Sequence, residues 1–179
     1  MTFHSLHCHT ANNMPSGIAV SAAAAWTPDG GLRLEYRLQG AIATLRVPPP
    51  AKPQATDGLW QHTCCEAFVA AAGEAAYREF NFSPSSRWAA YRFDAYRQRD
   101  MDWQPGAHPI VSLQIAGDCL RLLADIPASL LPETADLDLG LTVVIETPAG
   151  DKSYWALCHA GQQPDFHLRD SFTLPLTRP

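Results

Sequence analysis

Hydrophobic and polar residues alternate along much of the chain in short segments, as they do in β-strands. Between Leu32 and Leu38, apolar side chains occupy every second position and charged side chains occupy the three positions between them. Successive side chains of a strand point to opposite faces, so this segment is predicted to form a strand with one buried and one solvated face. Long stretches with apolar residues at helical spacing are missing. The pattern therefore predicts an all-β protein.

Turn-forming residues divide the sequence into about ten such strands. Fifteen prolines and eleven glycines are spread along the chain and separate the apolar segments. Three antiparallel hairpins are predicted, with turns at Gly73, at residues 117–118 and at residues 148–151. The predicted strands cover residues 18–27, 32–38, 42–47, 64–71, 75–82, 87–96, 110–116, 119–126, 137–147, 152–159 and 171–176.

Antiparallel hairpins in this number predict a two-sheet β-sandwich, because two sheets packed together bury one face of each. A closed barrel is the alternative. The length of 179 residues suits a single domain spanning residues 1–179. Within it, residues 1–15 are predicted to be a poorly ordered or edge segment.

Composition and charge exclude several classes of function. Hydrophobic residues make up 46% of the chain and the net charge is -5, which argues against nucleic acid as a partner. The N-terminus has no signal-peptide pattern, and no apolar stretch is long enough to cross a membrane. Five cysteines without CxxC spacing indicate free thiols. These features predict a cytoplasmic protein with no membrane role.

Strand alternation places a mixed aromatic and polar set of side chains on one possible sheet face. If the strands concerned are neighbours, that face carries Glu66, Asn81, Trp88, Arg92, Trp155 and His159. An aromatic ring packs on the apolar C–H face of a sugar, and carboxylate, amide and guanidinium groups bond its hydroxyls. The alternative interpretation is an ordinary solvated face that includes a glutamate–arginine ion pair.

Two loop segments add candidates at strand ends, where binding sites often lie. Trp60 and His62 lie in the segment 57–62, before a predicted strand. Asp165 and His167 lie in the segment 164–167, after another. The alternative is that Trp60 and Trp155 fill the core and that the histidines cap loops.

Several of these segments resemble a known family. The segments 57–68, 77–84, 88–93, 153–159 and 164–167 are similar to bacterial DOMON-like proteins, which are related to the family-nine carbohydrate-binding modules. The resemblance extends from about residue 16 to residue 176. It implies an immunoglobulin-like or jelly-roll β-sandwich that binds sugar or haem and has no catalytic activity of its own. The family pattern falls on Trp60 and Glu66, and on Tyr77, Glu79 and Phe80.

Alternative functions rest on fewer residues. Haem binding would need axial ligands such as Met14 or Met101 with a histidine, and no CxxCH motif is present. A metal site could form from His4, His7, Cys8 and His9, or from His159, His167 and Asp165.

A weak glycoside-processing enzyme could use Glu66 and Glu79 as paired carboxylates. Common hydrolase, metalloprotease and nucleotide-binding motifs are missing from the sequence. The sequence therefore favours non-catalytic binding of a small carbohydrate, with no cofactor, by a monomer or homodimer.

Overall fold

Twelve strands and four single-turn 3-10 helices make up the regular structure of the part of the chain that the computed structural model describes, residues 1–12 and 16–178. The strands are β1 (His4–Cys8), β2 (Ile18–Trp26), β3 (Leu32–Gly40), β4 (Cys64–Ala71), β5 (Tyr77–Phe82), β6 (Trp88–Ala95), β7 (Gln98–Arg99), β8 (Ile110–Ala116), β9 (Cys119–Ile126), β10 (Asp136–Glu146), β11 (Lys152–Ala156) and β12 (Leu174–Thr177). The helices are η1 (Ile42–Thr44), η2 (Leu59–Gln61), η3 (Ala128–Leu130) and η4 (Arg169–Ser171). None of the described helices has the length and apolar character needed to cross a membrane.

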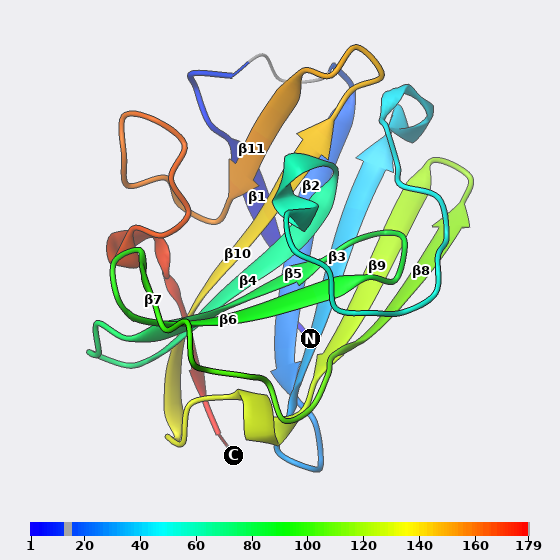
Figure 1. Cartoon of the computed structure of the whole chain (residues 1–179). Helices are drawn as coiled ribbons and strands as arrows, with labels where there is room; N and C mark the ends of the chain where they lie inside the picture. Colours follow the sequence, from blue (N-terminus) through cyan, green and yellow to red (C-terminus); the bar gives the residue numbers. More distant parts are fainter. Residues whose placement is uncertain (13–15, 179) are drawn as a thin grey trace.

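The strands form one antiparallel path that folds into two layers. Its order is β7-β6-β5-β4-β10-β11-β1-β2-β3-β9-β8, and β12 pairs with β10. We call β2, β3, β8 and β9 the first layer and β4, β5, β6, β7, β10, β11 and β12 the second layer; the layers cross in Figure 1. β1 joins them, because its first half pairs with β2 and its second half with β11. The end strands β7 and β8 do not pair among the described residues, so the predicted sandwich is confirmed and the closed barrel is not formed.

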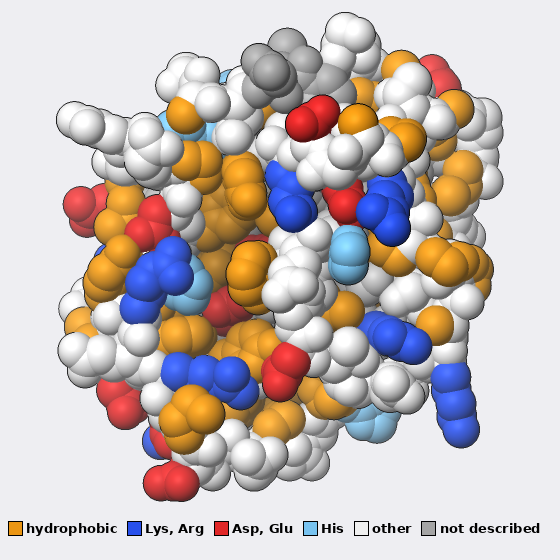
Figure 2. All heavy atoms as spheres, turned by 45° about the horizontal axis from the view of Figure 1, so that its top comes forward, with side chains coloured by type: hydrophobic (Ala, Val, Ile, Leu, Met, Phe, Trp, Pro, Cys, Tyr) orange, Lys and Arg blue, Asp and Glu red, His pale blue; other side chains and the backbone are white. Residues whose placement is uncertain are grey.

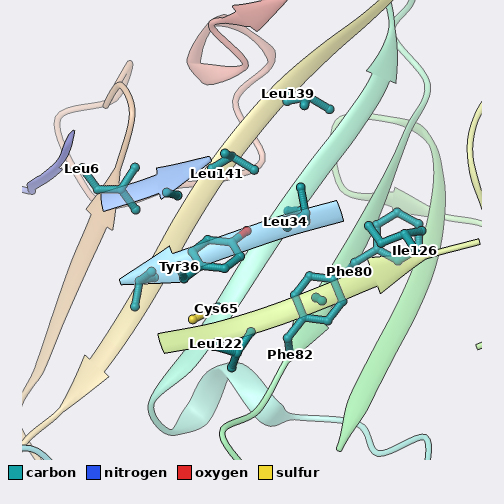
Figure 3. Packing of buried hydrophobic residues seen from close by; sticks show 14 of the residues in the cluster. Leu6, Leu34, Tyr36, Cys65, Phe80, Phe82, Leu122, Ile126, Leu139 and Leu141 are labelled. Atoms are coloured by element: carbon teal, nitrogen blue, oxygen red, sulfur yellow. The ribbon is translucent and has the colours of Figure 1, made fainter. Parts of the chain in front are cut away.

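The main core lies between the two layers. The alternating apolar residues of β3 all point inward, and their side chains are fully buried. They meet Phe80 and Phe82 of β5 and Leu139 and Leu141 of β10 (Figure 3). Burying side chains of this size stabilises the fold by about 1.5–3 kcal/mol each. The hydrophobic alternation that predicts β3 is therefore the same feature that holds the layers together.

A second cluster covers the other face of the second layer. Phe68, Tyr77, Tyr91 and Phe93 point away from the first layer. The loops before β4 and after β11 cover this outer face and contribute Leu59, Phe166 and Phe172. As a result β4 is buried on both faces, except at its last residue.

The three predicted hairpins are confirmed as β4–β5, β8–β9 and β10–β11. Residues 42–47, however, were wrongly predicted as a strand. The edge of β3 that they would have joined is filled by β9, and Ile42–Thr44 form η1 instead.

The prediction for residues 1–15 was also wrong for its first part. His4–Cys8 form β1 in the middle of the strand path, where both neighbouring strands supply hydrogen-bonding partners. Residues 13–15 lie outside the described residues.

One hydrogen bond crosses the main core and gives a test of this packing. The buried Tyr36 hydroxyl of β3 donates to the backbone carbonyl of Glu66 on β4 at 2.7 Å. Tyr36→Phe removes the donor and should lower the free energy of unfolding by about 1–2 kcal/mol in urea denaturation. Tyr154→Phe is the control, since no hydrogen bond from its hydroxyl is found among the described residues; it should change stability by less than about 0.5 kcal/mol. Equal effects of the two changes would contradict this role for Tyr36.

Candidate ligand-binding site

A cavity of about 1020 Å³ opens on the outer face of the second layer, under the loops that cover it. Figure 2 shows this hollow, with apolar side chains inside it and charged groups at its floor and edge. The strands β4, β5, β6 and β10 provide the floor, and residues 57–61 and 163–167 provide the walls. The lining residues are Asn12, Asp57, Gly58, Trp60, Gln61, Glu66, Phe68, Glu79, Tyr91, Phe93, Arg97, Arg99, Val144, Tyr154, Gln163, Pro164, Asp165, Phe166 and His167.

Two carboxyl groups lie at the floor of the cavity on adjacent strands. Glu66 of β4 is 3% exposed, and Glu79 of β5 is 6% exposed. Asn81 lies directly opposite Glu66 in the strand ladder, and its side-chain N–H group donates to Glu79 Oε1 at 2.8 Å. Glu66 Oε1 has no hydrogen-bond partner among the described residues. The floor therefore holds one supported carboxyl group and one with an unpartnered oxygen.

Burial makes these carboxyl groups weaker acids. It raises the pKa of Glu66 well above its usual value, and the nearby charge of Glu79 raises it further, although the neighbouring Thr142 hydroxyl on β10 opposes the shift. Burial also raises the pKa of Glu79 to about 7, although Asn81 and the charges of Arg97 and Arg99 oppose the shift. The pair therefore retains a proton near neutral pH.

His167 faces this pair from the C-terminal wall as a neutral ring. The Arg97 backbone N–H group donates to the Tyr77 hydroxyl at 3.2 Å, and that hydroxyl lies 2.7 Å from His167 Nδ1. The Tyr77 hydroxyl still has its hydrogen to donate to Nδ1, and the tautomer that matches this arrangement has its hydrogen on Nε2. His167 Nε2 lies 3.7 Å from Glu79 Oε2. Burial and the charge of Arg97 lower the pKa of His167 to about 4.

Asp165 fixes the rim of the cavity near Arg97. Its carboxylate accepts hydrogen bonds from Arg97 Nη2 at 2.9 Å, from the Tyr96 hydroxyl at 2.6 Å and from the His167 backbone N–H group at 3.0 Å. Burial raises the pKa of Asp165, but these hydrogen bonds outweigh it, so the pKa lies below its usual value. Arg97 itself has a left-handed backbone with φ of 55°, a conformation that L residues rarely adopt. The contacts of its backbone N–H and side chain hold it in place.

Trp60 stands at the mouth of the cavity on the opposite wall. It lies on η2, and its side chain is 49% exposed. Gly58, two residues before Trp60, adopts a positive φ of 72° that lets the chain turn into η2. The Tyr91 hydroxyl donates to Asp57 Oδ1 at 2.7 Å and ties this loop to β6. The exposed indole is therefore held by an anchored loop.

Four of the ten predicted site residues line the cavity: Trp60, Glu66, Asp165 and His167. Asn81 is fully buried beside them and acts on the floor through its hydrogen bond to Glu79.

The prediction that Trp88, Arg92 and Trp155 share the face of Glu66 was wrong. The register of β5 and β6 pairs Phe82 with Trp88, and both point into the main core. Trp155 of β11 is also in that core, where its indole N–H group donates to Ser153 Oγ at 2.9 Å. Arg92 forms an ion pair with Asp100. These three side chains lie on the inner face of the second layer, away from the cavity.

His62 and His159 lie outside the cavity lining as well. His62 Nδ1 is 2.8 Å from a carboxylate oxygen of Glu146. β11 ends at Ala156, so strand alternation does not extend to His159, whose Nε2 bonds the His7 carbonyl oxygen at 2.8 Å.

The residues of the alternative metal and haem sites do not come together in this way either. His159 bonds to the N-terminal strand, whereas His167 faces Tyr77 and Glu79. No group of three or more His, Cys, Asp or Glu side chains suited to a metal ion occurs among the described residues. Met101 is 71% exposed and lies outside the cavity lining. Met14 lies outside the described residues.

Sequence reasoning missed most of the aromatic wall. Tyr91 and Phe93 share a face of β6, and strand pairing joins that face to the face of Glu79. The signal was the short turn 83–87 between β5 and β6, which pairs Phe82 with Trp88 and hence Glu79 with Tyr91. Tyr154, Phe166, Arg97 and Arg99 carry no comparable local pattern, because tertiary folding brings their segments to the cavity.

Comparisons with known proteins relate this fold to carbohydrate-binding proteins. A protein of Bacteroides uniformis to which carbohydrate binding has been ascribed superposes with a TM-score of 0.72 and 18% identity, covering 100% of this chain and 87% of its own. A family 9 carbohydrate-binding module of Caldicellulosiruptor kristjanssonii, solved with glucose and with cellotriose, gives a TM-score of 0.62 and 10% identity in each case. These alignments cover 98% of this chain and 84% and 82% of the module chains. The superpositions establish a shared fold, and at identities this low they establish nothing beyond the fold.

No protein-family model matches the sequence, and no curated protein matches it.

The buried acid pair predicts how stability depends on pH. The pKa of Glu79 is about 7 in the folded chain against a usual value of 4.5, so the folded state holds a proton that the unfolded chain has lost between these values. The free energy of unfolding should therefore fall as pH rises through this window, by about 1 kcal/mol per pH unit. His167 opposes this fall only below its usual pKa of 6.5, since the folded pKa is about 4. Glu66, whose pKa is also raised well above its usual value, extends the fall to higher pH. The net fall should therefore be clearest above about pH 6.5, where the opposing contribution of His167 fades.

Urea denaturation across this range measures the effect, and Glu79→Gln should reduce the slope, because only the contribution of Glu66 remains. Glu74→Gln is the matched control, because Glu74 is exposed and lies outside the cavity. A wild-type profile that stays level or rises with pH would contradict the raised pKa.

Proposed function

We propose that this chain binds a small carbohydrate in the cavity on the outer face of its second layer and catalyses no reaction. The observation that carries the proposal is the exposed Trp60 ring at the mouth of a hollow whose floor holds buried carboxyl groups. Sugars present an apolar C–H face and a periphery of hydroxyls, so they require both kinds of contact in one place.

The aromatic contact comes from Trp60. Its indole is large and half exposed, and its loop is anchored through Asp57 and Tyr91. Stacking a pyranose on the ring removes apolar surface of both partners from water. Phe68, Tyr91 and Phe166 extend the apolar surface deeper into the cavity.

The polar contacts come from the floor and the rim. A sugar hydroxyl both donates and accepts hydrogen bonds, and a carboxyl pair that shares a proton offers both an acceptor and a donor. Glu66 and Glu79 are therefore suited to a pair of neighbouring hydroxyls. Gln61 and Gln163 on the two walls add amide groups at the edge.

The size of the cavity and the fold comparison support the same ligand class. A volume of about 1020 Å³ is at the upper end of the range for small-molecule sites, which is enough for a monosaccharide or a short oligosaccharide. The similar family 9 module was solved with glucose and with cellotriose. Membership of the DOMON-like proteins, a cytoplasmic location and a monomeric or homodimeric state stay predictions from the sequence.

The stacking role of Trp60 is open to direct test. Glucose and cellotriose should each bind the wild-type protein in isothermal titration calorimetry, and Trp60→Ala should weaken binding at least tenfold because it removes the stacking surface. Ile115→Ala is the matched control: Ile115 is 56% exposed on β8, in the first layer, and its loss should leave affinity unchanged. Equal affinity of wild type and Trp60→Ala would exclude this site.

Catalysis is tested separately with aryl glycosides. We expect no release of the aryl alcohol above background, because the fold is that of a binding module. Turnover that disappears in Glu66→Gln would instead assign a glycosidase role to the carboxyl pair.

A further inference from the structure

We propose that the carbohydrate preferred by this cavity carries a protonated amino group, which binds against Glu66 and Glu79. This inference rests on the proposed function and deepens it by naming the class of sugar. It follows from two deficits at the cavity floor, one of positive charge and one of hydrogen-bond donors.

The charge deficit follows from how the ionisable side chains of the cavity are paired. The lining contains four acidic residues, Asp57, Glu66, Glu79 and Asp165, and two arginines, Arg97 and Arg99. Arg97 forms its ion pair with Asp165, and the Arg99 guanidinium lies over the Tyr91 ring at 4.1 Å. Asp57 accepts the Tyr91 hydroxyl. Among the described residues, neither Glu66 nor Glu79 forms an ion pair with an arginine or lysine. Arg97 and Arg99 act on Glu79 only from a distance, so no cation contacts the floor directly.

The donor deficit is local to two facing residues. Glu66 Oε1 and Asn81 Oδ1 are buried acceptors without a partner among the described residues. The two residues lie directly opposite each other on β4 and β5, on the face that carries the cavity. The buried Thr142 hydroxyl of β10 lies directly opposite Glu66 on its other side, also has no partner among the described residues, and has one hydrogen to donate. Thr142 can therefore serve only one of the two acceptors. Buried acceptors are normally hydrogen-bonded, so the remaining acceptor indicates a donor that comes from a ligand.

A primary ammonium group corrects both deficits. It brings one positive charge and three N–H donors in a compact group. A neutral hydroxyl brings one donor and no charge, and an acidic sugar would be repelled by the carboxyl pair. A divalent metal ion fits less well, because calcium takes six to eight oxygen ligands and no cluster of three suitable side chains occurs among the described residues.

Binding of an ammonium group should also displace the proton that the pair shares. The ligand keeps its own protons, both carboxyl groups become ionised, and the proton passes to the buffer. The titratable groups around Glu66 are Glu79 on β5, Cys64 on its own strand and Tyr36 of the first layer. Along the walls, Asp57, Arg97, Arg99, Asp165 and His167 complete the set. Glu79, whose pKa is about 7, is the member of the carboxyl pair that titrates near neutral pH.

Calorimetry with D-glucose and D-glucosamine tests the proposal, because the two sugars differ in one hydroxyl and one amino group. At about pH 6.5, below the range of an α-amino group, glucosamine should bind about tenfold more tightly than glucose. Glu66→Gln should bring the ratio of the two affinities close to one, and the exposed control Glu74→Gln should leave the ratio unchanged. In wild type, the heat of glucosamine binding should vary with the ionisation enthalpy of the buffer, whereas the heat of glucose binding should not.

The outcomes separate this proposal from the proposed function. Glucose binding that equals or exceeds glucosamine binding would overturn the ammonium site and leave carbohydrate binding standing. A glucosamine preference that survives in Glu66→Gln would overturn the placement at Glu66, and buffer-independent heats would do so without any variant. If neither sugar nor cellotriose binds, the proposed function fails, and the ammonium site fails with it.

Discussion

Strand β4 has neighbours on every side, and the positions of the main core and the cavity both follow from that constraint. It pairs with β5 and β10 along its edges, packs Cys65, Ala67 and Val69 into the main core, and turns Glu66 and Phe68 toward the outer loops. A strand buried on both faces has no solvated side on which to place a charged residue. Glu66 is therefore desolvated wherever the loops close over it, and its acidity is set by the fold rather than by a single partner.

The pairing of charges around the cavity then decides what its floor can bind. Asp165 holds Arg97 at the rim, and Arg99 lies against Tyr91, so the cations nearest to the carboxyl pair are engaged elsewhere. His167 could have supplied a positive charge, but burial and the charge of Arg97 lower its pKa and keep its ring neutral. The polar network of the wall thus positions donors and aromatic rings while leaving the floor acidic.

Within a strand, the sequence predicts which side chains share a face, but not which of the two faces meets the main core. That assignment needs one face to be polar. On β3 one face is polar, and the alternation of apolar and charged residues was enough to predict the strand and its buried face. On β6 both faces carry aromatic rings, so Trp88 and Arg92 were placed on the face that Tyr91 and Phe93 in fact occupy.

Other features depended on tertiary partners that no local pattern encodes. β1 is a short, largely polar segment, and it is a strand because β2 and β11 leave an open edge on either side of it. Residues 42–47 are apolar enough for a strand but find the edge of β3 already paired with β9. Trp60 and Glu66 could be predicted because the loop-to-strand transition and the family resemblance both fall on them, whereas Phe166 and Arg97 reach the cavity only through folding.

The carboxyl pair shows why a binding site and a stable core make opposing demands on the same strand. A buried acceptor without a donor destabilises the folded chain by about 1–3 kcal/mol, and an apolar side chain at that position would remove the penalty. The main core lies on the opposite face of β4, in a cluster separate from the apolar residues around the cavity, and its burial offsets this loss. A ligand that donates a hydrogen bond to such an acceptor removes this penalty, and the free energy recovered contributes to its affinity. The stability lost at Glu66 and the selectivity expected of the cavity thus have a single physical origin.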